Sequence, residues 1–167
     1  GTVGYLAATS EVPPSTNYRS VTGGPDPNEQ AAVTDPSQWR TIYPETKPMQ
    51  LGTTTINVSI ADSLRERIRG LSETPFLPDD VVKLFVFYQN GSHSIWMKDM
   101  NYPLDIMWLS KAGEIVHIEP NVAPETYPDT FESPTPAWYV LEAAAGFVDR
   151  HELAVGDTLD LPKTDPA

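Results

Sequence analysis

The sequence predicts a β-rich domain with small helices. Several stretches alternate apolar and polar residues, others are continuously apolar and aromatic, and turn residues such as Gly, Pro and Asn separate them. Helical periodicity is confined to two short stretches, at 61–71 and after Gly146. A chain of 167 residues suits one ordinary domain with an additional segment. We therefore expect one β-rich domain at 51–162, followed by a polar tail at 163–167.

Residues 1–50 differ from the rest in composition. They hold seven of the 17 prolines and show no lasting period of 2 or 3.6 residues. Such a segment buries too little apolar surface to offset its ordering entropy. We expect a tether rich in Pro, Gly, Ser and Thr, or a segment wrapped on the domain, anchored by Trp39, Ile42 and Tyr43. Tethers of this kind often follow an export signal or lipid anchor, so we expect a periplasmic, secreted or surface-tethered location.

The domain begins with a strand and a helix. Residues 53–60 alternate apolar and polar side chains, which predicts a half-buried strand. Residues 61–71 have apolar residues at helical spacing. Ser63 and Glu66 have capping-box spacing, and Gly70 stands where the helix should end. The other helix face carries Arg65, Arg67 and Arg69, of which we expect the first two to be solvated.

The middle of the chain predicts three further strands. Residues 83–88 are apolar throughout and predict a strand buried on both faces. Asn90 and Gly91 predict a two-residue hairpin turn, with 93–97 returning antiparallel. A polar link ending in Pro103 precedes a strand at 103–109, and 114–119 alternates as the next strand.

The last third combines a long loop with short elements. Residues 120–136 contain five prolines and predict a loop of a length that often serves as a lid. Residues 137–142 favour a strand, followed by a turn at Gly146 and a short helix at 147–153. Residues 155–161 alternate and predict the last strand.

The order of short motifs resembles the family called domain of unknown function 192. The motifs are RGL at 69–71, LFVF at 84–87, IWMKDM at 95–100, PLDI at 103–106, PAWYVLE at 136–142 and VGD at 155–157. The resemblance runs from about residue 53 to residue 161. It implies a compact antiparallel β-barrel or jelly-roll-like sandwich with small helices, found in bacteria and archaea. It implies no settled activity.

Polar positions that match the family suggest a site. They include Arg69, Trp96, Lys98, Asp105 and Glu142. Asp105 and Glu142 stand in otherwise apolar strands, where a carboxylate needs a partner, and Arg69 is a plausible one. The group is either a structural ion pair or the lining of a pocket closed by the 120–136 loop. Trp96 or Trp138 would provide a stacking surface for a sugar or another small polar ligand.

Three functions remain open from these residues. The leading hypothesis is a non-catalytic binding module for a small polar ligand or glycan, with no catalytic residue assigned. A glycoside-type hydrolase that uses Asp105 and Glu142 as its carboxylate pair is the alternative. The third is an interaction module that docks a protein on an edge strand or on the proline-rich loop.

Composition excludes other classes. The net charge of −12 disfavours nucleic-acid and anionic-membrane partners, and no apolar run is long enough to insert into a membrane. The absence of cysteine excludes disulfides, thiolate zinc sites and a cysteine nucleophile. His93, Met97 and Met100 resemble copper ligands, but methionine more often fills a core. We expect no cofactor, no metal and a monomer.

Overall fold

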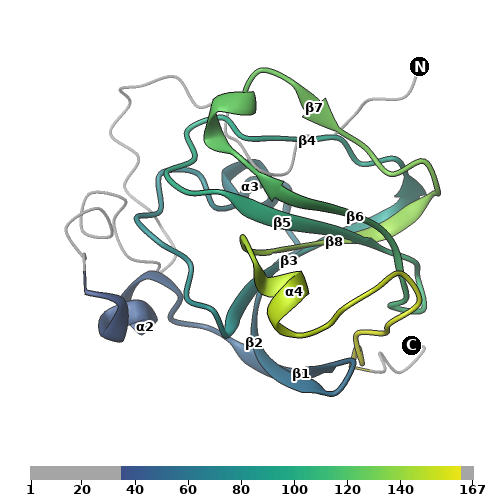
Figure 1. Ribbon diagram of the computed structural model, residues 1–167, viewed down its shortest axis with the longest axis horizontal. Helices are drawn as coiled ribbons and strands as arrows, with labels where there is room; N and C mark the ends of the chain where they lie inside the picture. Colours follow the sequence, from purple (N-terminus) through teal and green to yellow (C-terminus); the bar gives the residue numbers. More distant parts are fainter. Residues whose placement is uncertain (1–34, 163–167) are drawn as a thin grey trace.

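A six-stranded mixed sheet forms the centre of the computed structural model, which describes residues 35–162 (Figure 1). The strand order is β1-β2-β3-β8-β5-β6, and only β2 and β3 run parallel. Its strands are β1 (Lys47–Leu51), β2 (Thr54–Ala61), β3 (Val81–Gly91), β5 (Leu104–Leu109), β6 (Ile115–Val122) and β8 (Ala137–Ala144). A small second sheet pairs β4 (Ile95–Trp96) with β7 (Thr130–Phe131).

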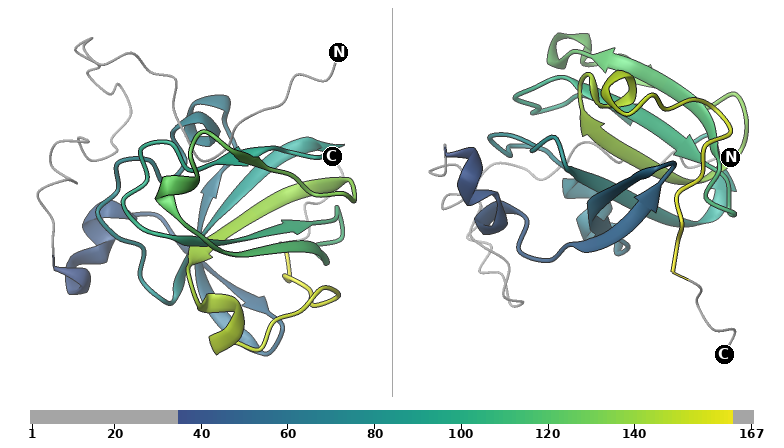
Figure 2. Two further views of the ribbon diagram at one scale, coloured as in Figure 1. Left: turned by 45° about the horizontal axis from the view of Figure 1, so that its top comes forward. Right: turned by 60° about the horizontal axis from the view of Figure 1, so that its bottom comes forward.

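Helical elements are short. They are η1 (Pro36–Gln38), α2 (Trp39–Ile42), α3 (Leu64–Arg69), η2 (Pro124–Thr126) and α4 (Phe147–Arg150). Figure 2 shows α2 outside the sheet and joined to β1 by an extended segment. No helix among residues 35–162 is long and apolar enough to cross a membrane. The fold is therefore mainly β with small helices, as the sequence predicts.

Each face of the large sheet carries its own core. On the first face, Phe85, Ile106 and Val140 pack with residues of α2, β4 and the loop after α3. On the second face, Leu84 and Leu141 pack with α4 and the chain near Leu159. Strand β5 buries all six of its side chains because both faces are covered. We call these the first and second faces below.

Helix α3 is the crossover between the parallel strands β2 and β3. The predicted capping box is present: Ser63 Oγ accepts from the Glu66 amide, and the Glu66 carboxylate accepts from the Ser63 amide. Gly70 ends the helix with φ of 50°, a conformation that glycine adopts without strain. Leu64 is 50% exposed, so the helix buries less of its apolar face than its spacing predicts.

The predicted hairpin at Asn90 and Gly91 is wrong. Strand β3 continues through Gly91, and its antiparallel partner is β8. Strand β4 pairs instead with β7, which lies within the predicted 120–136 loop. The local turn preference of Asn90 and Gly91 does not decide the pairing of β3. Pairing with β8 keeps the apolar strand β3 inside the sheet, where both of its faces are covered, and a short hairpin would not.

The sheet is not closed into a barrel within residues 35–162. The predicted strand at 155–161 is reduced to two single bridges, Leu51 with Leu159 and Glu114 with Thr158. Backbone hydrogen bonds reinforce these bridges. The Ile115 amide donates to the Asp157 carbonyl, and the Gly52 amide donates to the Thr158 carbonyl. This C-terminal segment links the two outer strands at one end of the sheet without adding a strand of its own.

The start of the described chain is more ordered than its composition predicts. The expected anchors Ile42 and Tyr43 are 5% and 4% exposed, and Trp39 packs against them from the surface. Strand β1 begins at Lys47, inside the expected tether. Residues 1–34 of the expected tether and the tail at 163–167 lie outside the described residues.

Candidate functional site

A cavity of about 1030 Å³ opens where β1 leaves the sheet. The pairing of β1 with β2 ends at Lys47 and Val58, so the last residues of β2 have no partner on that side. Residues 42–47 form one wall and α3 forms another, while Ser59 and Lys83 lie on the strands between them. We call this the Lys83 cavity. Its volume is that of a small-molecule site.

Three polar residues form a row across the first face beneath this cavity. Ser59 on β2 is the register partner of Lys83 on β3, and Lys83 is the register partner of Glu142 on β8. The next residue in the row is Ile106 on β5, which belongs to the first core. Cross-strand partners have adjacent side chains, so the serine hydroxyl, the ammonium group and the carboxyl group are neighbours.

Glu142 is completely buried, and among residues 35–162 neither of its carboxyl oxygens has a hydrogen-bond partner. Burial raises the pKa of Glu142 to about 8, and the positive charge of Lys83 only partly opposes this. A carboxyl group in this state is mostly protonated at neutral pH. It can therefore donate a hydrogen bond or a proton, which an ionised glutamate cannot.

Lys83 is half-buried and donates one hydrogen bond, from Nζ to Ser59 Oγ at 3.0 Å. Burial lowers its pKa to about 8, while the negative charge of Glu66 on α3 acts in the opposite direction. An ammonium group has three donors, and Glu142 accepts none of them. Lys83 thus brings donor capacity to the cavity beyond its bond to Ser59.

Hydroxyl groups line the cavity beside this row. Tyr43 donates to the Phe76 carbonyl at 2.8 Å, and its oxygen lies 3.5 Å from that of Tyr102. Thr74 Oγ1 lies 2.6 Å from the Tyr102 oxygen. Burial raises the pKa of both tyrosines, and the charge of Glu142 adds to this at each of them. Tyr43 and Thr74 line the cavity directly.

Of the expected site residues, Arg69 lines the Lys83 cavity, and Glu142 lies beneath it as the cross-strand partner of Lys83. Arg69 lines it from the end of α3, and its charge acts on both Lys83 and Tyr43. The expected Arg69 pairing with a buried carboxylate is wrong, because Glu142 accepts no bond and Asp105 bonds to backbone amides. Burial lowers the pKa of Arg69 from its ordinary value.

Asp105 lies on the opposite face of the sheet from Glu142. Register partners across β5 and β8 share a face, and Glu142 pairs with Ile106 of the first core. Asp105 alternates with Ile106 and precedes Met107 of the second core by two residues. Its oxygens accept from the amides of Asn121 and Val148, each at 2.9 Å. The sheet therefore separates the two carboxyl groups that the hydrolase alternative requires.

Trp96 and Lys98 form a separate group near the β4–β7 sheet and do not line the Lys83 cavity. The Trp96 ring lies edge-on to Tyr127, with ring centres 5.2 Å apart, and Lys98 Nζ is 5.6 Å from the Trp96 ring. No residue of the 120–136 loop lines the cavity either, so the expected lid is wrong for this site.

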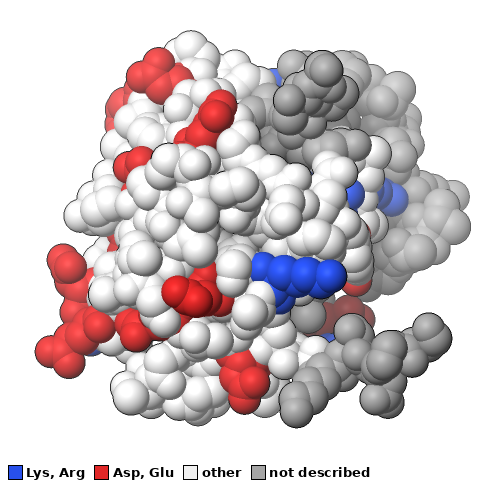
Figure 3. Space-filling view, turned by 90° about the vertical axis from the view of Figure 1, so that its right-hand side faces the viewer, with Lys and Arg blue, Asp and Glu red and all other residues white. Residues whose placement is uncertain are grey.

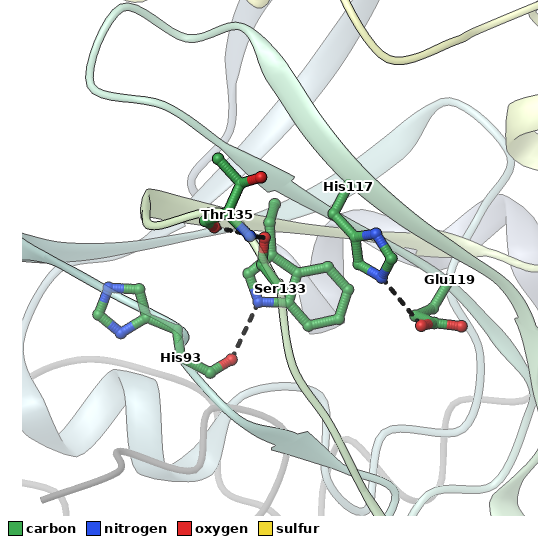
Figure 4. A network of polar contacts seen from close by, with 6 residues as sticks. His93, His117, Glu119, Ser133 and Thr135 are labelled. Atoms are coloured by element: carbon green, nitrogen blue, oxygen red, sulfur yellow. Dashed lines mark hydrogen bonds and ion pairs between the residues drawn. The ribbon is translucent and has the colours of Figure 1, made fainter. Parts of the chain in front are cut away.

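The three histidines of the chain have ordinary protein partners. Figure 4 shows His117 facing Glu119, with Nε2 and Oε1 2.9 Å apart, and His93 near the same network. The His93 carbonyl accepts from the Trp108 indole at 3.0 Å, and its ring stacks on Phe87. His151 Nδ1 lies 3.3 Å from Thr54 Oγ1. Residues 35–162 contain no group of three or more His, Cys, Asp or Glu side chains that could hold a metal ion.

A second hollow is smaller than the Lys83 cavity and has fewer polar side chains in its lining. It measures about 230 Å³ and lies over residues 90–92 and 133–136, with no charged residue in its lining. Ser133 Oγ there donates to the Thr135 carbonyl at 2.5 Å, within the network drawn in Figure 4. The hydroxyl group of Ser133 in this lining is therefore already hydrogen-bonded within its own loop.

Sequence reasoning missed Ser59, Lys83, Tyr43 and Thr74. Lys83 carried a usable signal, since it is a lone cation at the start of an apolar strand that is buried on both faces. The contribution of Ser59 could not be foreseen, because it depends on parallel pairing across a crossover. Tyr43 lay in a segment whose composition suggests a linker.

Comparison with known protein families shows to which family the chain belongs. The family model for domain of unknown function 192, described as "Uncharacterized ACR", matches residues 47–161. The chain belongs to this family. The match begins at the first strand and ends just after the segment that links the outer strands, so it spans the whole sheet. No curated protein matches the chain.

Two crystal structures are similar to this member of the family. One, from Sinorhizobium meliloti, belongs to a protein provisionally named a transcription regulator; it shares 29% identity with a TM-score of 0.66, covering 70% of this chain and 93% of that one. The other, from Novosphingobium aromaticivorans, belongs to a protein of unknown function; it shares 22% identity with a TM-score of 0.65, covering 70% and 85%. The second supports the fold alone.

Proposed function

We propose that this domain is a non-catalytic binding module for a small polar ligand or glycan, and that the Lys83 cavity is its site. The observation that carries the proposal is the row of Ser59, Lys83 and Glu142 at a cavity of about 1030 Å³. Buried polar groups normally satisfy one another, yet Glu142 has no hydrogen-bond partner and Lys83 has only one. A polar ligand in the cavity would supply the missing contacts of Lys83, which lines it, whereas Glu142 lies fully buried beneath the lining.

The glycoside hydrolase is the weaker alternative. Its two carboxyl groups must flank one bond of the substrate. Asp105 and Glu142 point to opposite faces of the sheet, and both oxygens of Asp105 are engaged by backbone amides. Around the Lys83 cavity, Glu142 is the buried acid, and Glu66 is occupied by its capping box. That arrangement favours binding over hydrolysis.

A role in DNA binding, which the name of the Sinorhizobium protein would suggest, finds little support. The chain carries 23 acidic and 11 basic residues. Figure 3 shows acidic side chains spread over one face, with few basic ones between them. Such a surface repels the phosphate backbone. A protein partner that docks on an edge strand stays the third possibility, and sedimentation at several concentrations would reveal it.

The proposal is tested by a thermal-shift panel of sugars, nucleotides and small acids on the full chain, followed by calorimetry of each hit. A ligand at a hundredfold excess over Kd stabilises the folded state by about 2.7 kcal/mol, which is readily measured. Lys83→Met should weaken binding about tenfold or more. Lys111→Met is the matched control, because Lys111 is exposed and lies over Trp138, outside the cavity. Equal loss in both variants would reject this site.

We also propose an extracytoplasmic location. The proline-rich composition of residues 1–50 supports it, since that composition suits a tether. Protease treatment of spheroplasts, from which the outer membrane has been removed, followed by detection with an antibody against the domain, tests it together with an assay of the medium. Protection of the domain in spheroplasts but not in lysed cells would place it in the cytoplasm and reject the proposal.

A further inference from the structure

We propose that the ligand of the Lys83 cavity is a small organic anion whose carboxylate accepts hydrogen bonds from the Lys83 ammonium group, and that its binding is linked to a proton held in the Lys83–Glu142 pair. This inference rests on the proposed function, since it names the chemical class of the ligand. Three features carry it: the charge of the lining, the open donors of Lys83 and the uncharged state of Glu142.

The cavity concentrates positive charge in an acidic protein. Four of its lining side chains are basic and three are acidic, although the whole chain has 11 basic and 23 acidic residues. One of the three acids, Glu66, is already engaged, because its carboxylate accepts from the Asp62 and Ser63 amides. The lining therefore has a small excess of basic side chains, in contrast to the chain as a whole, and this favours an anion as its ligand.

Lys83 is the group that an anion would meet on the strands. It is half-buried, lines the cavity and donates one of its three N–H groups to Ser59 Oγ. Charged donors in a partly desolvated site bind carboxylates more strongly than neutral donors do. Tyr43 and Thr74 are also in the lining, and their hydroxyl groups donate to the carbonyls of Phe76 and Leu71, so of these three groups Lys83 is the one with open donors.

Glu142 does not neutralise Lys83. It is the cross-strand neighbour of Lys83, yet its oxygens accept no hydrogen bond. The other charged groups that act on Lys83 are Glu66 and Arg69, both from α3, and they oppose each other. Tyr43 and Tyr102, on which the charge of Glu142 acts, are uncharged at neutral pH, and burial raises the pKa of each further above the ordinary value. Below about pH 8 the row thus carries the positive charge of Lys83 and a neutral acid.

Raising the pH should release the anion. The pKa of Glu142 is raised to about 8 and that of Lys83 is lowered to about 8, so the loss of a proton from either group in this range makes the net charge of the row more negative by one. A carboxylate ligand then meets either an ionised Glu142 or a neutral Lys83. Affinity should fall as the pH passes through this range, and binding above it should take up a proton.

Paired probes on the full chain test the inference. Galacturonate is compared with galactose, and succinate with succinamide, by calorimetry at about pH 6.5 and about pH 9.5. We expect at least one acid to bind at the lower pH about tenfold or more tightly than its neutral partner, and to lose about tenfold or more at the higher pH. Glu142→Gln should keep binding at the lower pH and show a smaller loss at the higher one, because an amide does not ionise.

The outcomes separate this inference from the proposed function. If galactose binds as well as galacturonate in a manner that Lys83→Met weakens, the cavity is a ligand site but not an anion site, and the inference fails alone. If an acid binds equally to the parent chain and to Lys83→Met, the anion lies elsewhere and the inference is again overturned. If neither acids nor neutral compounds of the wider panel bind, both proposals fail. The comparison of acid with neutral partner needs no variant, so it holds even if a substitution prevents folding.

Discussion

At the scale of single residues, two buried carboxyl groups in adjacent strands have opposite fates. Asp105 receives two backbone amides, while Glu142 receives none. Their sequence contexts are alike, since each interrupts an apolar strand. The difference arises from the neighbours: Asp105 faces the amides of Asn121 and Val148, and Glu142 faces Lys83. The sequence therefore predicts that both acids matter, but not that backbone amides satisfy only one of them.

The first residue-scale prediction concerns Glu142 and pH. Its pKa in the folded state is raised to about 8 from an ordinary 4.5, so it contributes stability that is complete below about pH 4.5 and is lost as the pH rises through 8. Glu142→Gln should match the parent protein near pH 5 and become the more stable of the two near pH 9. Urea unfolding across this range measures the difference. Parallel curves for the two proteins would show that Glu142 is ionised throughout.

The second residue-scale prediction concerns Asp105. Asp105→Ala leaves two amides without acceptors in or beside the second core, and should lower the free energy of unfolding by about 2–4 kcal/mol. Asp129→Ala, at an exposed acid, is the control and should change stability by less than about 0.5 kcal/mol. If denaturation gives equal midpoints for both variants, Asp105 does not anchor β6 and α4.

At the scale of elements, predictions based on local chemistry held, and the hairpin predicted at Asn90 and Gly91 did not. The sequence correctly predicted the capping box of α3, its end at Gly70 and the apolar strands β3 and β5. Each of these depends on groups that lie within a few residues of one another. The pairing of β4 with β7 and of β3 with β8 joins distant segments. No local pattern specifies which of several apolar strands will pair.

The prediction at this scale concerns α3, which forms a wall of the Lys83 cavity. Ser63→Ala removes the acceptor for the Glu66 amide and should cost about 1 kcal/mol of stability. Ser63→Asp keeps a cap and should restore it. Since Arg69 reaches the cavity from the end of this helix, ligand affinity should fall in the alanine variant and recover with aspartate. Affinity that is unchanged in Ser63→Ala would show that α3 does not order the site.

At the scale of the whole molecule, the site exists because separate segments meet. The Lys83 cavity combines the segment before β1, the end of β2, the crossover helix and β3. Composition suggested a linker for the first of these, and the parallel crossover has no short sequence signature. Arg69 and Glu142 were predicted because they match polar positions of the family, and Glu142 also interrupts an apolar strand. Their shared surroundings depend on a topology that only the structure specifies.

The same scale carries the last prediction, on how the outer strands are linked. Leu159 is fully buried in the second core, bridges Leu51 and donates its amide to the Gly113 carbonyl at 2.8 Å. Leu159→Ala should cost about 3 kcal/mol through lost burial and the cavity it leaves. Because the segment at 157–160 contacts β1 and the residue before β6, amide exchange should accelerate in β1 and in the start of β6 together, which mass spectrometry resolves.

The matched control for this prediction is Val155→Ala, in the same segment but 60% exposed, which should change stability by less than about 0.5 kcal/mol. If Leu159→Ala accelerates exchange in β1 alone, the segment protects one edge and does not couple the two. Coupled exchange would mean that this unclosed sheet resists opening at its edges as one unit. The first strand, where the Lys83 cavity begins, would then depend on packing at the far end of the chain.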